Sequence, residues 1–468
     1  MADQKSHHRV RNTFIVVLLL VLIGLTAGGV KFILVRQSMQ VRINQQLRTL
    51  ASQGYPVTLE ELNDWYKVPD GEKNAASLYM EAIDHLKEWD PDAMSKMPLL
   101  SDENTAEANE ALNPATVELM EKYLTAQTET LGLLKEAAKL KYCRYPADFR
   151  YGQKMQLNWL PEIRSCQRVL CIQMQLAVAK DNVSDFMEAF TVSTALVRSL
   201  EQEPTQVSQV VRVACLGMSM TVLEQALSRL TFTEKQLADL SDQLASHKDT
   251  QAWVRGTAGV VCEQINRFRN PDAMMASAKS EDVELPGWLS KLYWVMGWAD
   301  RDTIEYLDVA RCALTPGWQT SRDLLSISKA LKAQDNAIPK THFLTNIGCS
   351  GWDQVFDLYV QHMVQMDCAK TVLAIKRYEL QHRSLPETLE ALVPQFLDVV
   401  PIDPFDGKPI RFQCKDNQVM VYSLGKNGQN HRDWTKNSDL IDQSYDLSFT
   451  VKQNQVPPPN PDPQGLTI

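Results

Sequence analysis

Apolar residues recur every three or four positions along most of the chain, which is the spacing of one face of an α-helix. The clearest block runs from Leu160 to Leu244, where the polar stretch "KDNVS" separates two such runs. Ser184 in that stretch is the predicted N-cap of the second helix, and Pro204 is predicted to end it. We therefore predict a mainly α fold in which neighbouring helices pair as antiparallel hairpins.

Further helices are predicted on both sides of this block. Thr58 and Glu61 form a capping-box pattern that predicts a helix start, and the stretch from about Asn109 to Leu140 is predicted to form one long helix. Another long helix is predicted from Trp352. The pairing is similar to that of tetratricopeptide repeats, but the Trp, Gly and Pro positions of that repeat do not recur at its period of about 34 residues. The sequence thus predicts stacked helical hairpins without assigning a repeat family.

The run from Thr13 to Val35 is almost purely apolar, with Lys31 as its only charge. At about 1.5 Å per residue it is long enough to cross a hydrocarbon core of about 30 Å, so we predict a membrane anchor that contacts lipid through residues 13–35. A cleaved signal peptide is the alternative, because a basic start and the small residues "TAGG" fit that description. The anchor is favoured because the apolar run continues past the small residues. Basic residues flank the run equally, so the positive-inside rule leaves its orientation open.

The stretch "ELPGWLSKLYWVMGWADRD" is the most apolar one after the anchor, and it is too short to span a bilayer. Trp288, Trp294 and Trp298 lie close together in it. One interpretation is a helix that rests on the membrane surface with its indole rings at headgroup level. The other is a helix whose aromatic rings pack into the protein core, and this is the one we expect.

Near the C-terminus the pattern changes from helix to turn and strand, in "LPETLEALVPQFLDVVPIDPFDGKPIRF". An apolar stripe from Leu385 to Phe396 is predicted to pack beneath the turn, and "QVMVYSL" alternates as a strand. Proline cannot donate to a central strand ladder, and glycine accepts a positive φ, so this composition is typical of a turn. The predicted turn residues are Pro401, Asp403, Pro404, Asp406 and Gly407.

Composition narrows the partners and the redox chemistry. The net charge of the 468 residues is -9, which gives no support for a nucleic-acid partner. The nine cysteines are an odd number and contain no Cys-x-x-Cys pair, so no disulfide framework or metal motif is predicted. We expect these thiols to be buried as small apolar side chains.

The segment from about Ala374 to Phe449 resembles the globular half of a type II secretion major pseudopilin. The resemblance is carried by "YELQHRSLPETLEALVPQFL", "VPIDPFDGKPIRF" and "VYSLGKNGQN". The stretch "NAASLYMEA" is similar to a helix near the anchor of large uncharacterised bacterial membrane proteins that carry similar C-terminal segments. The resemblance implies a small C-terminal α+β module and a location at the inner membrane, with the bulk of the chain in the periplasm.

The chain also departs from the pseudopilins. Their membrane helix begins with a processing Gly, then Phe, with Glu at the fifth mature position, whereas here Asn12 and Thr13 precede Phe14 and no acid follows until beyond the span. Prepilin-type cleavage and fibre assembly are therefore not expected. The family binds calcium in its last loop, but "NGQNHRD" replaces the family's "DGxGG" here. Either a calcium site or a solvated polar loop is expected from the aspartates of that region, which are Asp433, Asp439, Asp442 and Asp446.

Motifs of common catalytic sites are missing from the sequence. It has no His-Glu-x-x-His zinc helix, no Gly-x-Ser-x-Gly elbow and no Walker phosphate loop. His362 and Asp367 share a predicted helix but are five residues apart, so they present no ligand pair, and Glu379 near His382 is expected on a solvated helix face. We therefore predict no catalytic residue and no cofactor apart from the calcium considered above.

The predicted function is a non-enzymatic one at the cell envelope, in which a membrane-anchored protein acts as a scaffold or binds an unidentified protein partner. One alternative is an accessory component of a type II secretion or pilus-like system. Another is an envelope hydrolase whose active site is assembled from distant segments. The predicted parts are a tail (1–12), the anchor (13–35), a helical body (36–349), a long helix with the pseudopilin-like module (350–452) and a disordered Pro-rich tail (453–468).

Overall fold

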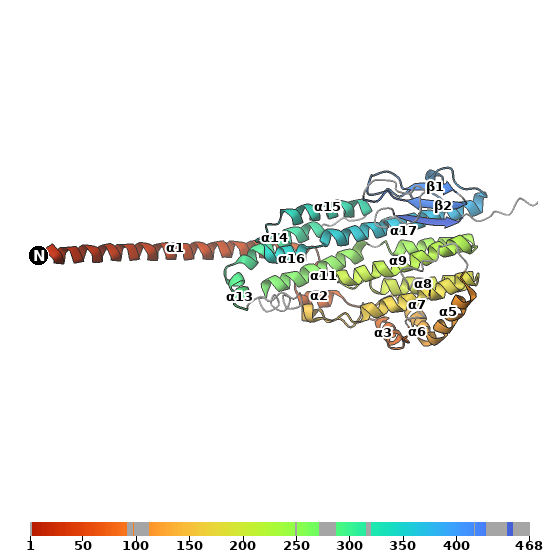
Figure 1. The fold of residues 1–468 in the computed structure, drawn as a ribbon, viewed down its shortest axis with the longest axis horizontal. Coiled ribbons are helices and arrows are strands. Elements are labelled where there is room, and N and C mark those ends of the chain that lie inside the picture. The colour runs from red at the N-terminus through yellow and green to blue at the C-terminus, as the bar shows by residue number, and fades with distance from the viewer. Residues whose placement is uncertain are drawn as a thin grey trace, which may run out of the picture.

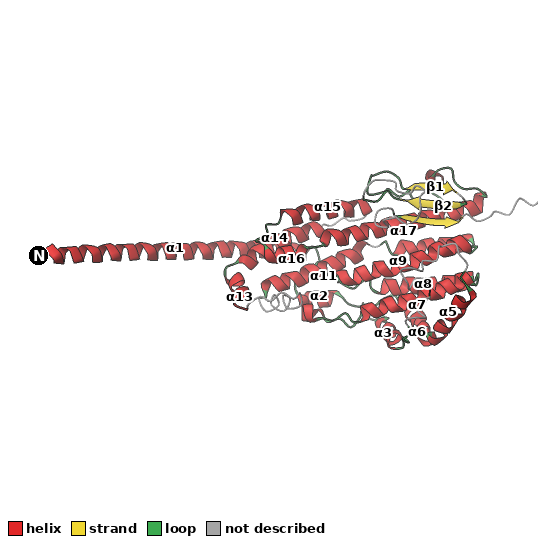
Figure 2. Cartoon of the chain, viewed as in Figure 1, coloured by secondary structure: helices red, strands yellow, loops and turns green. Residues whose placement is uncertain are grey.

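The computed structural model describes residues 2–90, 97, 112–248, 250–270, 287–314, 320–415, 417–426 and 447–452. Most of them are helical, as predicted, and form an elongated body from which one helix projects (Figure 1). Within these described residues one small sheet lies on one side of the body, and the other regular elements are helices (Figure 2).

The elements are named as in Figure 1. The helices are α1 (Ala2–Ser52), α2 (Leu59–Trp65), α3 (Ala76–Asp84), α5 (Pro114–Ala126), α6 (Thr128–Ala138), α7 (Trp159–Ala179), α8 (Val183–Ser199), α9 (Gln206–Arg229), α10 (Glu234–Ser246), α11 (Thr250–Arg269), α13 (Gly287–Val295), α14 (Trp298–Ala313), α15 (Ser321–Ala337), α16 (Phe343–Cys349) and α17 (Trp352–His382). The short 3-10 helices are η1 (Phe149–Lys154) and η2 (Leu389–Leu392), and the strands are β1 (Arg411–Lys415), β2 (Gln418–Tyr422) and β3 (Ser448–Lys452).

Two of the described helices, α1 and α9, are long and apolar enough to cross a membrane. The most apolar part of α1 is not buried against the rest of the protein, whereas more than half of the corresponding part of α9 is buried. Helix α9 is therefore a core helix of the body, and α1 has the exposed apolar surface that a membrane-spanning helix presents to lipid.

The second half of α1 packs into the body without any break in the helix. Ile43, Leu47 and Leu50 are buried in the core that also contains α14. Asp300 at the start of α14 accepts hydrogen bonds from Arg36 Nε at 3.1 Å and from Gln40 Nε2 at 2.7 Å. Because the helix is continuous from its exposed apolar segment to these contacts, the body is held in a defined position relative to that segment.

Helix α17 connects the two large cores of the body. Its N-terminal half, up to Met363, packs in the core that holds α1, α11, α14 and α15, and its C-terminal half, from Val364, packs in the core that holds α7 to α10. The helix has buried residues on all sides, and in Figure 1 it runs between α15 and the sheet on one side and α9 on the other. Its C-terminal half has no solvent-facing side and must be enclosed, which explains the number of elements around it, whereas Gln354 and Leu358 of the N-terminal half are exposed.

The sheet is antiparallel with the order β1-β2-β3. Val421 of β2 lies opposite Phe412 of β1 and Phe449 of β3, and β3 contacts both α9 and α17. Phe449 and Val451 are buried, so β3 contributes its alternate side chains to the larger core. The strand expected at the end of "PFDGKPIRF" corresponds to β1 and the one in "QVMVYSL" to β2, while β3 was not predicted from the sequence.

Several local predictions can be compared with the structure. The Thr58 and Glu61 capping box is present at the start of α2. The single helix expected from about Asn109 to Leu140 is wrong, because α5 and α6 are separated at Gln127, whose side-chain amide bonds the backbone N and O of Lys87 instead. The Ser184 cap is also wrong, since Asn182 accepts the hydrogen bond from the backbone of α8.

The aromatic segment around α13 does not pack as expected. Trp288, Trp294 and Trp298 are 66%, 36% and 38% exposed, and Leu292 and Val295 are exposed between them. The expectation of a core helix is therefore wrong for these rings. Helix α13 lies at the end of the body from which α1 projects, and among the described elements it packs mainly on α14 and contacts Arg36 of α1 (Figure 1).

We predict that Gly259→Ala destabilises the protein strongly. A Cβ at this position of α11 would lie 1.7 Å from the backbone oxygen of Pro204, which no rotamer change can relieve. We expect the free energy of unfolding to fall by at least about 2 kcal/mol, measured by denaturant unfolding in detergent. Gly217→Ala in α9 is the matched control, since nothing lies within 4 Å of its Cβ and alanine favours a helix. Equal stability of the two variants would contradict the close packing of α11 against Pro204.

Candidate functional site

A polar pocket lies where four segments meet, at the ends of α1 and α2, the α8–α9 connection and the start of α11. Gly54 adopts a φ of +86°, which lets the chain reverse after α1, and the Thr58 capping box then begins α2. At the end of α2, the Tyr66 hydroxyl accepts a hydrogen bond from the backbone N of Tyr145 at 2.9 Å, and the Arg144 guanidinium lies over the Tyr66 ring. The pocket wall is thus held by contacts between distant segments.

The pocket has a volume of about 350 Å³, which suits one small ligand or one side chain of a partner. Its charged lining residues are both cations, Lys67 and Arg255. The rest of the lining consists of three amides, three aromatic rings and two small or apolar residues, which are Gln53, Gln202, Gln251, Tyr55, Trp65, Tyr66, Gly54 and Val254. No carboxylate or histidine is among these lining residues, so the pocket is suited to bind an anionic, hydrogen-bonding group rather than to transfer protons.

A buried carboxyl group lies behind this pocket. Glu203 follows the lining residue Gln202, is fully buried, and influences the ionisation of Tyr66 through its charge. Burial raises the pKa of Glu203 from 4.5 to about 7, although the side chains of Ser208 and Trp159 act in the opposite direction. Neither carboxyl oxygen has a hydrogen-bond partner of normal geometry among the described residues. Glu203 therefore titrates near neutral pH but does not reach the pocket lining.

Two histidines and an arginine form a second buried polar group between α9, the end of α10 and α17. Arg212 is 1% exposed, and its Nε donates to Gln209 Oε1 at 2.8 Å. Burial lowers the pKa of His247 and His362, to about 3 for His362, and the Arg212 charge lowers both further. Both imidazoles are therefore neutral at physiological pH, and Arg212 carries the positive charge of this group.

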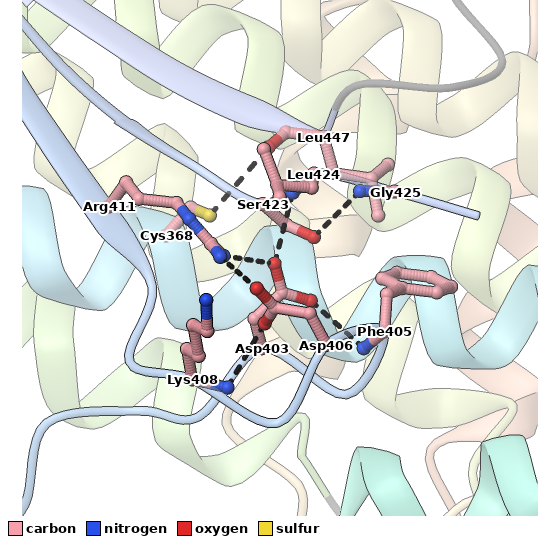
Figure 3. Close-up of polar contacts among 10 residues, drawn as sticks. All are labelled: Cys368, Asp403, Phe405, Asp406, Lys408, Arg411, Ser423, Leu424, Gly425 and Leu447. Atoms are coloured by element: carbon pink, nitrogen blue, oxygen red, sulfur yellow. Dashed lines mark hydrogen bonds and ion pairs between the residues drawn. The ribbon is translucent and has the colours of Figure 1, made fainter. Parts of the chain in front are cut away.

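The predicted C-terminal turn is organised by Asp403, which is fully buried (Figure 3). Its carboxylate accepts hydrogen bonds from the backbone N of Phe405 and Leu424, each at 3.0 Å, and forms an ion pair with Arg411 Nη1 at 2.6 Å. One carboxylate thus ties the turn to the first residue of β1 and to the segment after β2. This is a structural arrangement, because each carboxylate oxygen is used within the protein.

The other predicted turn residues also fit their expected roles. Gly407 has a φ of +74°, and its backbone N donates to the carbonyl of Asp403 at 2.9 Å. Asp406 bonds the backbone N of Lys408 and the Arg411 guanidinium, and these contacts outweigh partial burial and hold its pKa below the usual value. Pro401 and Pro404 lie outside the strands, as predicted.

The remaining predicted site residues do not form a site in the described part of the chain. Asp433, Asp439, Asp442 and Asp446 lie outside the described residues, so the calcium site stays a prediction. Among the residues that are described, no group of three or more His, Cys, Asp or Glu side chains is placed to hold a metal ion. The cysteines are all free thiols and all but Cys312 and Cys414 are buried.

Two expectations about α17 had different outcomes. His362 and Asp367 do not act as a pair, since Asp367 forms an ion pair with Lys248 Nζ at 2.6 Å. Glu379 was expected on a solvated face, and this is wrong, because it is 4% exposed. His382 is exposed and stacks on Tyr378 instead, with ring centroids 4.0 Å apart.

Sequence reasoning missed Glu203, Arg212 and the pocket lining. The only local signal for Glu203 is its place between the end of α8 and Pro204, and Arg212 has apolar neighbours on both sides, Val211 and Val213. No family model matches the chain, and neither a curated protein nor a solved structure matches it significantly. The pseudopilin-like interpretation of the C-terminal segment therefore stays a prediction.

We predict that Glu203→Gln stabilises the protein at alkaline pH. The unfolded chain releases this proton near pH 4.5 and the folded chain near pH 7, so the folded parent loses stability as the pH rises across that window. Glutamine mimics the protonated carboxyl and avoids this loss. The free energy of unfolding of the variant should exceed that of the parent by up to about 3 kcal/mol at pH 8 and by little at pH 4. Unfolding of parent and variant at both pH values measures the difference. A gain that does not depend on pH, or one shared by the exposed control Glu387→Gln, would contradict the assignment.

We also predict that Asp403→Ala unfolds the C-terminal module locally. The substitution leaves Arg411 without its buried partner and removes the acceptor of two backbone N–H groups, at a cost of about 3 kcal/mol. Amide hydrogen exchange in β1 and β2 should become faster, while exchange in α7 and α8 stays unchanged. Asp398→Ala, at an exposed aspartate of the same segment, is the control and should behave as the parent. Unchanged exchange in Asp403→Ala would show that the turn does not depend on this carboxylate.

Proposed function

We propose that this chain is a single-span membrane protein whose helical body lies outside the cytoplasm and binds another protein without catalysing a reaction. In this proposal α1 is the anchor, the stacked helices form a scaffold, and the pocket between α1, α2 and α11 receives an anionic group of the partner. The observation that carries the proposal is the pocket lining, which combines two cations, three amides and three aromatic rings.

The construction of the body supports a scaffolding role. Its attachment to α1 is made by buried apolar residues and by the Asp300 contacts rather than by a flexible linker. Such an attachment presents the pocket in one orientation relative to the membrane. A binding protein benefits from this because less orientational freedom is lost when its partner binds.

The resemblance of the C-terminal segment to the pseudopilins supports a body that lies outside the cytoplasm. The similarity of the helical pairing to tetratricopeptide repeats supports a protein-binding role. A dense network around Asp403 gives the C-terminal module a defined shape, as a docking piece requires. For that reason an accessory role in a type II secretion or pilus-like system remains the first alternative.

An envelope hydrolase is the alternative from another class. It is favoured by one observation, the carboxyl of Glu203 with a pKa of about 7, which is suited to acid–base chemistry. Against it, Glu203 is fully buried behind Tyr66 and no second carboxylate lines the pocket. Binding is therefore the function that this pocket supports best.

Labelling of a native thiol tests the orientation. Cys414 on β1 is exposed, Cys312 is half-buried and the other thiols are buried. We expect a membrane-impermeant maleimide to label Cys414 in spheroplasts after mild reduction, and the Cys414→Ser variant to lose most of the label. Labelling that appears only after the membrane has been opened would place the body in the cytoplasm and contradict the proposal.

Charge reversal in the pocket tests the binding role. The full-length protein is cross-linked in its native membrane and recovered, and its covalently attached partners are compared between the parent and Lys67→Glu. We expect the partner to be lost or strongly reduced with Lys67→Glu and retained with Lys73→Glu, since Lys73 is also exposed but lies outside the pocket lining. Identical partners for all three proteins, or none for the parent, would contradict a binding role of this pocket.

A further inference from the structure

Helix α13 exposes a large apolar surface at one end of the body. Trp288 is 66% exposed, Val295 is 53% exposed, and Leu292 and Met296 are 40% and 42% exposed. The neighbouring Lys291 is also exposed. In water, such a concentration of aromatic and aliphatic side chains is unfavourable, and exposed surfaces of this kind are typical of contacts with a membrane or another protein.

The position of α13 beside α1 favours a membrane over another protein as the contact of this surface. Arg36 Nη1 donates to the carbonyl of Val295 at 3.2 Å, and Arg36 Nη2 donates to the carbonyl of Trp294 at 3.2 Å. Arg36 directly follows Val35, the last residue of the apolar run of α1. The end of α13 is therefore level with the point at which the predicted anchor leaves the hydrocarbon core.

The contacts that hold α13 leave its apolar face uncovered. The Tyr293 hydroxyl donates to Asp302 Oδ2 at 2.6 Å, and Asp302 is a buried residue of α14. Arg36 bonds the last carbonyls of α13, which have no partner within the helix, and its guanidinium lies 4.9 Å from the centre of the Trp294 ring. The helix is thus fixed through its backbone and through Tyr293, while the rings of Trp288 and Trp294 stay accessible.

From this geometry we infer that α13 is an interfacial helix that inserts its exposed tryptophan, leucine and valine side chains into the headgroup region of the membrane that α1 spans. Indole rings prefer this region because they are apolar and still donate a hydrogen bond. Lys291 is exposed on the same helix, and its charge can approach lipid phosphates. Exposed apolar side chains occur on α13 and on α1 up to Val35, and Arg36 joins the two helices at that point.

The inference rests on the membrane-spanning role proposed for α1, and photo-crosslinking of the full-length protein separates the two. The photoreactive residue p-benzoylphenylalanine is placed, one site at a time, at three exposed positions, which are Trp288 in α13, Leu25 in α1 and Val399 in the C-terminal module. The proteins are reconstituted in nanodiscs of phosphatidylethanolamine and phosphatidylglycerol. Val399 is the matched control, because it is as exposed as Trp288 but lies close to the end of α17 that is remote from α1.

Lipid adducts are quantified by mass spectrometry of the intact protein after irradiation. We expect adducts at Leu25 and Trp288, with the yield at Trp288 roughly tenfold above that at Val399. A yield at Trp288 equal to that at Val399, with adducts at Leu25, would overturn the interfacial role of α13 and leave the anchor intact. Absence of adducts at Leu25 would overturn the anchor and this inference together. A thermal unfolding curve like that of the parent confirms that each labelled protein is folded.

Discussion

The enclosure of α17 is the packing constraint on which the rest of the body depends. From Val364 to Lys376 this helix carries buried side chains in every direction, so this half needs neighbours around its whole circumference. Its first half packs on one face, where Trp253 stacks on Tyr359 with ring centroids 4.9 Å apart, and its second half is covered by α9, α10 and the sheet. Since α1 packs in the first of these cores and the C-terminal module in the second, α17 connects the anchor mechanically with the module.

Polar groups in the body fall into two classes with different consequences. Asp300, Asp302 and Asp403 each receive hydrogen bonds from distant segments, so they hold α1, α13 and the turn in place. Glu203 and Arg212 are as deeply buried but receive far fewer contacts from the described residues. Burial of an ionisable group without such contacts lowers stability, and proteins retain it mainly where it has a further use.

The sequence allowed prediction of features that depend on neighbouring residues. The apolar run of α1, the Thr58 and Glu61 capping box and the turn at Gly407 each follow from residues a few positions apart, and the structure contains all three. The pocket could not be predicted, because Gln53, Lys67, Gln202 and Arg255 meet only after four segments have folded together. The aromatic segment of α13 was misjudged for a related reason, since a pattern of apolar residues does not tell whether protein or lipid covers it.

Because α1 is continuous, it also fixes the distance between the end of its apolar segment and the pocket. Between Arg36, at the predicted membrane surface, and Gln53, in the wall of the pocket, the helix rises by about 25 Å at its standard rise per residue. No hinge in α1 allows the pocket to approach the bilayer or to withdraw from it. In the proposed arrangement α1 therefore sets the separation between the pocket and the membrane surface.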